Sequence, residues 1–141
     1  MTAIRRTGTA LHRILLAFPT ALFPAAMITD IAYLRTAQIQ WSNFSAWLIT
    51  GGLVFGGLVL VWSLAELALA FRTAGRAIHA IYAGLLAAMC LLGLVNAFKH
   101  SQDAWSSVGT FGLILSILCA LLAIAAAALA FSGLLHPEVD Q

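Results

Sequence analysis

The sequence predicts an all-α protein, a bundle of four transmembrane helices, and three observations support this fold class. The chain of 141 residues is 62% hydrophobic and only 9% charged, whereas soluble domains carry about 25% charged residues. Its apolar residues form four long stretches, each at least as long as the roughly 20 residues with which a helix crosses a bilayer. Short segments that carry Arg35, Arg72, Arg76 and Lys99 separate these stretches, and the other three arginines lie before the first stretch or at its start.

The four predicted spans fill most of the chain and leave no room for a second domain. They are residues 12–34, 46–71, 77–98 and 107–135. We therefore expect residues 1–141 to form one integral membrane domain. The first stretch follows Arg5 and Arg6 as a signal peptide would, but it is too long, and Pro19, Pro24 and Asp30 interrupt it. We expect it to be retained as a helix.

The basic residues predict the orientation of the spans. Cytoplasmic connections carry an excess of Lys and Arg. With four antiparallel spans, five arginines lie on the side of the N-terminus, and Arg35 and Lys99 lie on the other side. The five are Arg5, Arg6, Arg13, Arg72 and Arg76. Both termini are therefore predicted to be cytoplasmic (N-in and C-in). The net charge of +2 reflects this topology, and we expect no nucleic-acid partner.

Small residues in the second span indicate close helix packing. Gly52 and Gly56 form a GxxxG pattern, and Gly51 and Gly57 widen the small-residue face. Such a face lets another helix backbone approach closely. The sequence leaves open whether that helix belongs to the same chain or to a second copy in a homo-oligomer.

Two histidines begin spans that run in the same direction, so we expect them at similar depth. His12 is followed by Arg13, and His79 lies one turn after Arg76. Two facing imidazoles can ligate the iron of haem b or another metal, arginines can pair with haem propionates, and bundle cores hold such cofactors. The other interpretation is that each histidine is an interfacial residue at a helix end.

The remaining polar residues of the spans predict two clusters. Glu66 lies at the depth of His79, and a carboxylate in a span is normally paired, either simply with His12, Arg76 or His79 or as an orienting group for a ligating imidazole. At the outer side, Asp30 is expected to pair with residues at the end of the third span. These are Asn96, Lys99 and His100.

No catalytic motif accompanies these polar residues. The chain contains no HExxH, no CxxC, no phosphate-binding glycine loop and no nucleophile elbow. We therefore do not expect the isolated chain to be an enzyme.

The first span also carries a family resemblance. Residues 11–23, LHRILLAFPTALF, followed by Asp30, resemble the opening of the bacterial DUF2231 family of predicted membrane proteins. Residues 45–52 resemble the start of its second helix, and His79 resembles the start of its third. Family members usually carry a second His before Phe-Pro, where this chain has Ala17. The resemblance implies an electron-transfer setting, since some members resemble or are joined to Rieske-type redox modules, and it singles out His12, Asp30 and His79.

Three function classes follow. The first is a small redox-linked protein of the bacterial inner membrane that binds haem b between His12 and His79, with other redox subunits as partners. The second is an accessory or structural subunit of a larger membrane complex. The third is an oligomeric small transporter, for which repeat symmetry would be expected and is not evident in the sequence.

Overall fold

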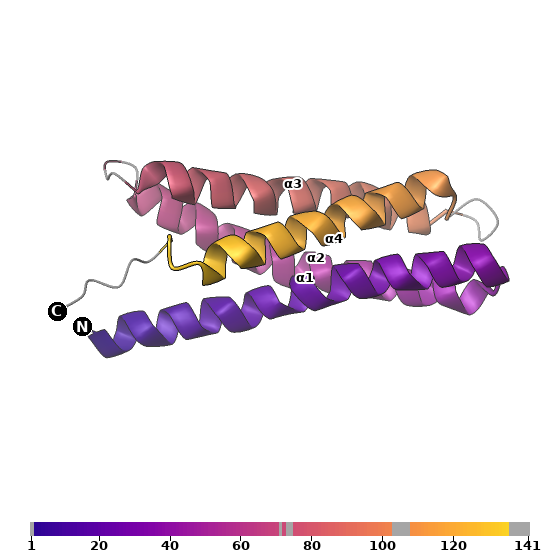
Figure 1. Cartoon of the computed structure of the whole chain (residues 1–141), viewed down its shortest axis with the longest axis horizontal. Helices are drawn as coiled ribbons and strands as arrows, with labels where there is room; N and C mark the ends of the chain where they lie inside the picture. Colours follow the sequence, from indigo (N-terminus) through magenta and orange to yellow (C-terminus); the bar gives the residue numbers. More distant parts are fainter. Residues whose placement is uncertain (1, 71, 73–74, 103–107, 136–141) are drawn as a thin grey trace.

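The computed structural model describes residues 2–70, 72, 75–102 and 108–135, with residues 2–9 described as backbone only. These residues form four α-helices (Figure 1), namely α1 (Thr2–Thr36), α2 (Ile39–Leu69), α3 (Arg76–His100) and α4 (Thr110–Phe131). Each helix contains an apolar segment long enough to cross a membrane. The described part of the chain is therefore all-helical and built to lie in a bilayer.

The helices pack side by side as a bundle. Each helix packs against its neighbours in the chain, and α4 returns to pack against α1. Within the described residues, α1 and α3 make no close backbone approach to each other, nor do α2 and α4. In Figure 1, α1 begins and α4 ends at the same end of the bundle. The four helices thus enclose one central core.

Each helix contributes one stripe of buried residues to this core. Along every stripe the buried positions alternate between steps of three and four residues, which is the heptad pattern of interlocking helices. The stripes are His12, Leu16, Pro19, Phe23, Ala26 and Asp30 in α1; Ser42, Ser45, Ile49, Gly52, Gly56, Val59 and Ser63 in α2; Tyr82, Leu86, Met89, Gly93, Asn96 and His100 in α3; Gly112, Ser116, Cys119, Ala123, Ala126 and Ala130 in α4. Polar residues lie mostly toward the ends of the stripes, and the middle is apolar.

Phe23 fills the middle of the core because two glycines make room for its ring. A Cβ atom added to Gly52 of α2 would lie 3.1 Å from the Phe23 ring, and one added to Gly93 of α3 would also lie 3.1 Å from it. The other glycine of the GxxxG pattern, Gly56, faces Met89 of α3. Both glycines of the GxxxG pattern are therefore used for packing within this chain, whereas a Cβ atom added to Gly57 would have nothing within 4 Å.

The helix bounds differ from the expected spans at the first connection. The sequence predicted a connection over residues 36–45, but α2 begins at Ile39, so only Ala37 and Gln38 separate α1 from α2. Ala37 makes the turn with a positive φ of 53°. The physical reason is that hydropathy marks where residues become polar, while the helical hydrogen bonds continue through the polar residues. The expected end of the second span at residue 71 and start of the fourth at residue 107 lie outside the described residues.

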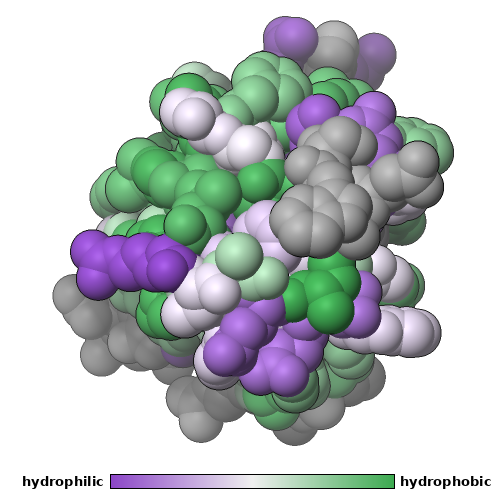
Figure 2. Space-filling view, turned by 90° about the vertical axis from the view of Figure 1, so that its right-hand side faces the viewer, coloured by the Kyte–Doolittle hydropathy of each residue, from purple (hydrophilic) through white to green (hydrophobic). Residues whose placement is uncertain are grey.

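The end of the bundle where α1 meets α2 presents polar residues. Figure 2 shows hydrophilic surface gathered on this end between hydrophobic patches. Arg35, Gln38 and Gln40 are exposed there, together with Phe44 and Trp47. A mixture of polar and aromatic side chains is typical of the boundary between lipid and water. This end is therefore suited to lie at a membrane surface.

Candidate functional site

Four side chains from α1, α2 and α3 meet at the end of the bundle where α1 begins, and we call them the His12 cluster: His12, Trp62, Glu66 and Tyr82. The Nε2 atom of His12 and the hydroxyl of Tyr82 lie 2.7 Å apart in a buried hydrogen bond. The Trp62 ring stands edge-on to His12, with ring centroids 5.6 Å apart. The indole N–H of Trp62 donates to Oε1 of Glu66 at 2.8 Å.

The helix geometry explains why these residues meet. His12 and Tyr82 lie on the buried stripes of α1 and α3 and are 5% and 0% exposed. Trp62 and Glu66 are half-buried and are four residues apart in α2, so they are neighbours on one face of that helix. The cluster therefore joins one imidazole, one carboxyl group and two oxidisable aromatic rings at one level of the bundle.

The residue of α3 that shares a hydrogen bond with Nε2 of His12 is Tyr82. His79 is half-buried and lies three residues, or about 4.5 Å along the helix, nearer the start of α3. The sequence reasoning named His79 and did not anticipate Tyr82, and the pairing of His12 with His79 stays a prediction.

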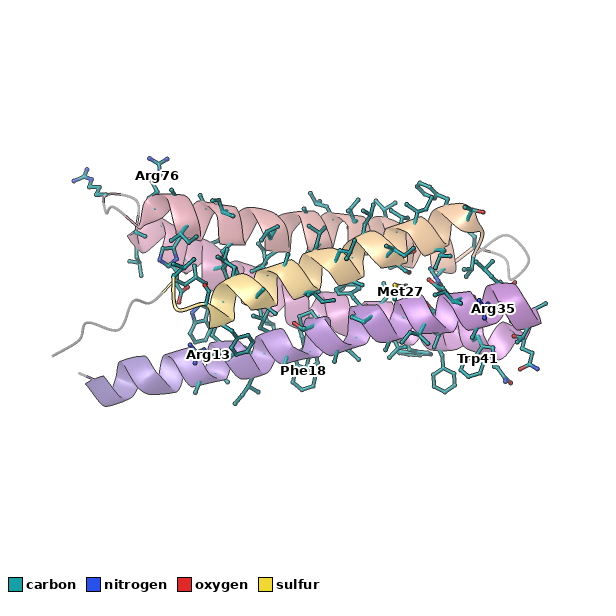
Figure 3. All side chains as sticks on the ribbon, in the orientation of Figure 1. Arg13, Phe18, Met27, Arg35, Trp41 and Arg76 are labelled. Atoms are coloured by element: carbon teal, nitrogen blue, oxygen red, sulfur yellow. The ribbon has the colours of Figure 1, made fainter. Side chains whose placement is uncertain are left out.

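Arg13 and Arg76, which were predicted to pair with haem propionates, make contacts outside the His12 cluster or point away from the bundle. The guanidinium of Arg13 lies over the ring of Phe131 in α4, 5.5 Å from its centroid. Arg76 is exposed, and Figure 3 shows its side chain pointing away from the bundle. Neither residue belongs to the His12 cluster as it is defined above.

The packing around His12 bears on the predicted haem. A haem iron on Nε2 of His12 would have to displace the Tyr82 hydroxyl, which lies 2.7 Å from that atom. The described residues also contain no group of three or more His, Cys, Asp or Glu side chains placed to hold a metal ion. The cluster in this arrangement does not fit a haem on His12 Nε2, and haem binding stays a prediction.

A second group, the Asp30 cluster, lies toward the other end of the bundle and consists of Asp30, Asn96, His100 and Ser116. Oδ1 of Asp30 is 2.9 Å from Nε2 of His100, and Oδ2 of Asp30 accepts from the Ser116 hydroxyl at 2.5 Å. Ser116 in turn accepts from Nδ2 of Asn96 at 2.8 Å. The Nδ1 atom of His100 lies 2.9 Å from the backbone oxygen of Asn96. The hydrogen bonds therefore close a ring through α1, α3 and α4.

The ring determines where the protons lie. A carbonyl oxygen only accepts, so Nδ1 of His100 must carry a hydrogen toward Asn96. Nε2 of His100 and Oδ1 of Asp30 then share a single proton, as an imidazolium with a carboxylate or as a neutral imidazole with a carboxylic acid. All four residues are at most 7% exposed. Asp30 and His100 therefore form a buried proton-sharing pair.

Asn96 is not fully satisfied by this ring. Its Oδ1 atom has no hydrogen-bond partner among the residues that the structure describes, although Asn96 is fully buried. An unpaired buried acceptor has a free-energy cost of about 1–3 kcal/mol. The cluster therefore contains one acceptor, Oδ1 of Asn96, that its own hydrogen bonds do not use.

Three members of the two clusters could not be singled out from the sequence. Trp62, Tyr82 and Ser116 lie inside apolar stretches and have no motif around them. Heptad spacing is the one sequence signal that could have marked two of them as buried, because Ser116 lies on the buried stripe of α4 and Tyr82 on that of α3. Lys99, which was expected among the partners of Asp30, instead donates to Oε1 of Gln102 at 2.8 Å.

Four membrane-length helices with ionisable groups buried toward both ends define a multi-span integral membrane protein. The family described as predicted membrane protein (DUF2231) matches residues 8–133. The chain therefore belongs to the DUF2231 family, and the match extends beyond the residues on which the resemblance was first based. No curated protein matches the chain, and no solved structure matches it.

Proposed function

We propose that the protein lies in the bacterial inner membrane as an antiparallel bundle with both termini in the cytoplasm. The five-to-two division of arginine and lysine supports this orientation. Contacts between the early part of α1 and the late part of α2, such as His12 with Trp62, support the antiparallel arrangement. In this orientation the His12 cluster lies on the cytoplasmic side and the Asp30 cluster on the outer side.

The proposed function is participation in electron transfer as a small redox-linked partner of other membrane subunits. The observation that carries this proposal is the His12 cluster, in which two oxidisable rings each contact a group that can accept a proton. Ionisable side chains are costly in a bilayer and usually mark function there.

Electron flow in membranes tests this function. In a strain that lacks the protein, we expect membrane cytochromes to be reduced more slowly by an added electron donor. The wild-type gene should restore the rate, and His12→Phe should not, because it removes the proton acceptor of Tyr82. Thr50→Ala is the matched control, since Thr50 is exposed on α2. Equal rates in all membranes that contain equal amounts of protein would contradict the function.

Haem b is the cofactor that would fit this function if Tyr82 moved away from His12. If His12 and His79 hold haem, protein purified from haem-supplied cells shows a Soret band that His12→Ala and His79→Ala each abolish. Tyr82→Phe should then increase the haem content, because it frees Nε2 of His12. No Soret band in both the wild type and Tyr82→Phe would reject haem as the cofactor.

A further inference from the structure

We infer that Tyr82 and Trp62 are redox-active side chains, each of which gives up one electron while its proton moves to a hydrogen-bonded base, His12 for Tyr82 and Glu66 for Trp62. The biological setting of this inference rests on the proposed electron-transfer function. The oxidation of the two side chains can be measured on the purified protein. The electron-transfer function and this inference can therefore be rejected independently of each other.

Tyr82 has the surroundings that a reversible tyrosine oxidation needs. A phenol that loses an electron becomes a strong acid, and for a fully buried phenol the nearest place for the proton is a neighbouring base. Nε2 of His12 is 2.7 Å from the Tyr82 oxygen, which is within the range of a strong hydrogen bond. The proposal uses the neutral tautomer of His12 that carries its hydrogen on Nδ1, because only then is Nε2 an acceptor for the Tyr82 hydroxyl. Tyr82 is fully buried, so the radical would be shielded from reactants in water.

Trp62 is the second side chain of the cluster that can be oxidised. Its indole N–H donates to Oε1 of Glu66 at 2.8 Å, so this ring also has an acceptor for its proton. The His12 ring contacts both aromatic residues, with centroid distances of 5.6 Å to Trp62 and 5.7 Å to Tyr82. Trp62 is half-buried while Tyr82 is buried. Trp62 is therefore placed to pass the oxidation inward from the side of the bundle.

The electrons and protons balance in a simple way. A one-electron oxidant, which in a membrane would be an oxidised metal centre of a partner subunit, takes one electron from Tyr82. The O–H bond of Tyr82 breaks, and its proton forms an N–H bond on Nε2 of His12, giving a neutral tyrosyl radical and an imidazolium. When Trp62 is oxidised instead, the oxidant takes one electron from the indole, and the N–H proton moves to Oε1 of ionised Glu66. Trp62 regains an electron from Tyr82 and its proton from Glu66. A one-electron donor of a partner subunit, such as a reduced metal centre, then re-reduces the Tyr82 radical, and the proton returns from His12 to the phenol oxygen.

The chain offers a matched control for this chemistry. It contains two tyrosines, and the other, Tyr33, lies in α1 three residues after Asp30, toward the end of the bundle away from His12. Tyr33→Phe therefore removes a phenol while leaving the His12 cluster as it is. Tyr82→Phe removes only the reactive hydroxyl from the cluster.

Photo-oxidation of the purified full-length protein in lipid nanodiscs tests the inference. A ruthenium polypyridyl complex with an irreversible electron acceptor serves as the one-electron oxidant, and electron paramagnetic resonance detects the radical. The wild type and Tyr33→Phe should give a long-lived tyrosyl radical that Tyr82→Phe lacks. His12→Phe should slow its formation about 100-fold, the lower range for loss of a positioned base. Trp62→Phe should also slow it.

Two results would overturn the inference. One is a tyrosyl signal that persists in Tyr82→Phe and disappears in Tyr33→Phe. The other is a rate of Tyr82 oxidation in wild-type protein that is the same after expression in D₂O as after expression in H₂O, because the proposed proton movement to His12 requires an isotope effect once the phenol carries deuterium. This second measurement uses the unchanged protein and so does not depend on whether His12→Phe folds. Slow cytochrome reduction in the deletion strain without a Tyr82 radical would support the function and reject this mechanism.

Discussion

Replacing Asp30 with alanine is expected to lower the free energy of unfolding by about 3–5 kcal/mol, the cost of removing one partner from a buried ionisable pair. The substitution leaves His100 buried without its partner oxygen 2.9 Å away and leaves the Ser116 hydroxyl without its acceptor. Neutral hydrogen bonds between membrane helices are worth only about 0.6 kcal/mol on average. The loss should therefore exceed what two such bonds explain.

Comparison variants distinguish the contribution of the Asp30–His100 pair to stability from that of the hydrogen bonds around it. Ser116→Ala should cost much less than Asp30→Ala, because it removes hydrogen bonds and leaves Asp30 with His100. The double replacement of Asp30 and His100 by leucine should cost less than Asp30→Ala alone, because no ionisable group is left without its partner. Lys99→Ala is the control outside the cluster. The measurement is unfolding by SDS in mixed micelles, and a double variant less stable than the single variant would contradict the paired assignment.

Enlarging both glycines around Phe23 is the second change with a large expected effect. Gly52→Ala and Gly93→Ala each place a Cβ atom 3.1 Å from the Phe23 ring, and overpacking of a core typically costs about 1–3 kcal/mol. Alanine has a better helix propensity than glycine, and this offsets up to about 1 kcal/mol of the destabilisation caused by each single substitution. With both alanines present the ring cannot shift to either side. The double variant should therefore lose more stability than the sum of the two single changes.

Other positions provide the controls for this prediction. Gly57→Ala adds a Cβ atom with nothing within 4 Å, so it should keep or raise the stability. Gly56→Ala makes one close contact, with the terminal Cε methyl of Met89 at 2.8 Å, and a flexible methionine can move aside. Thermal unfolding followed with a thiol-reactive dye suits this series, because Cys119 is buried and Cys90 half-buried. A double variant as stable as Gly57→Ala would contradict the described fit of Phe23.

The sequence predicts the helices well and the clusters only in part. Apolar length alone predicts four membrane-length helices, because an apolar segment of about 20 residues crosses a bilayer as a helix that satisfies its own backbone hydrogen bonds. Asp30 and His100 could be placed near one another because both lie near the end of a span that runs in the same direction. The partner of His12 could not be predicted, since a change of register by one turn decides between His79 and Tyr82. Ser116 was missed because a serine within an apolar span is chemically unremarkable until its neighbours are known.

The two clusters share helices, and this has a mechanical consequence. α1 supplies both His12 and Asp30, and α3 supplies both Tyr82 and His100. His12 and Asp30 lie on the same stripe of one helix, 18 residues and therefore about 27 Å apart. A displacement of α1 at one cluster therefore has a direct path along the same helix to the other. Pro19 and Pro24 lie on that path, and because proline interrupts the helical hydrogen bonds, they are the positions at which α1 can bend between the two clusters.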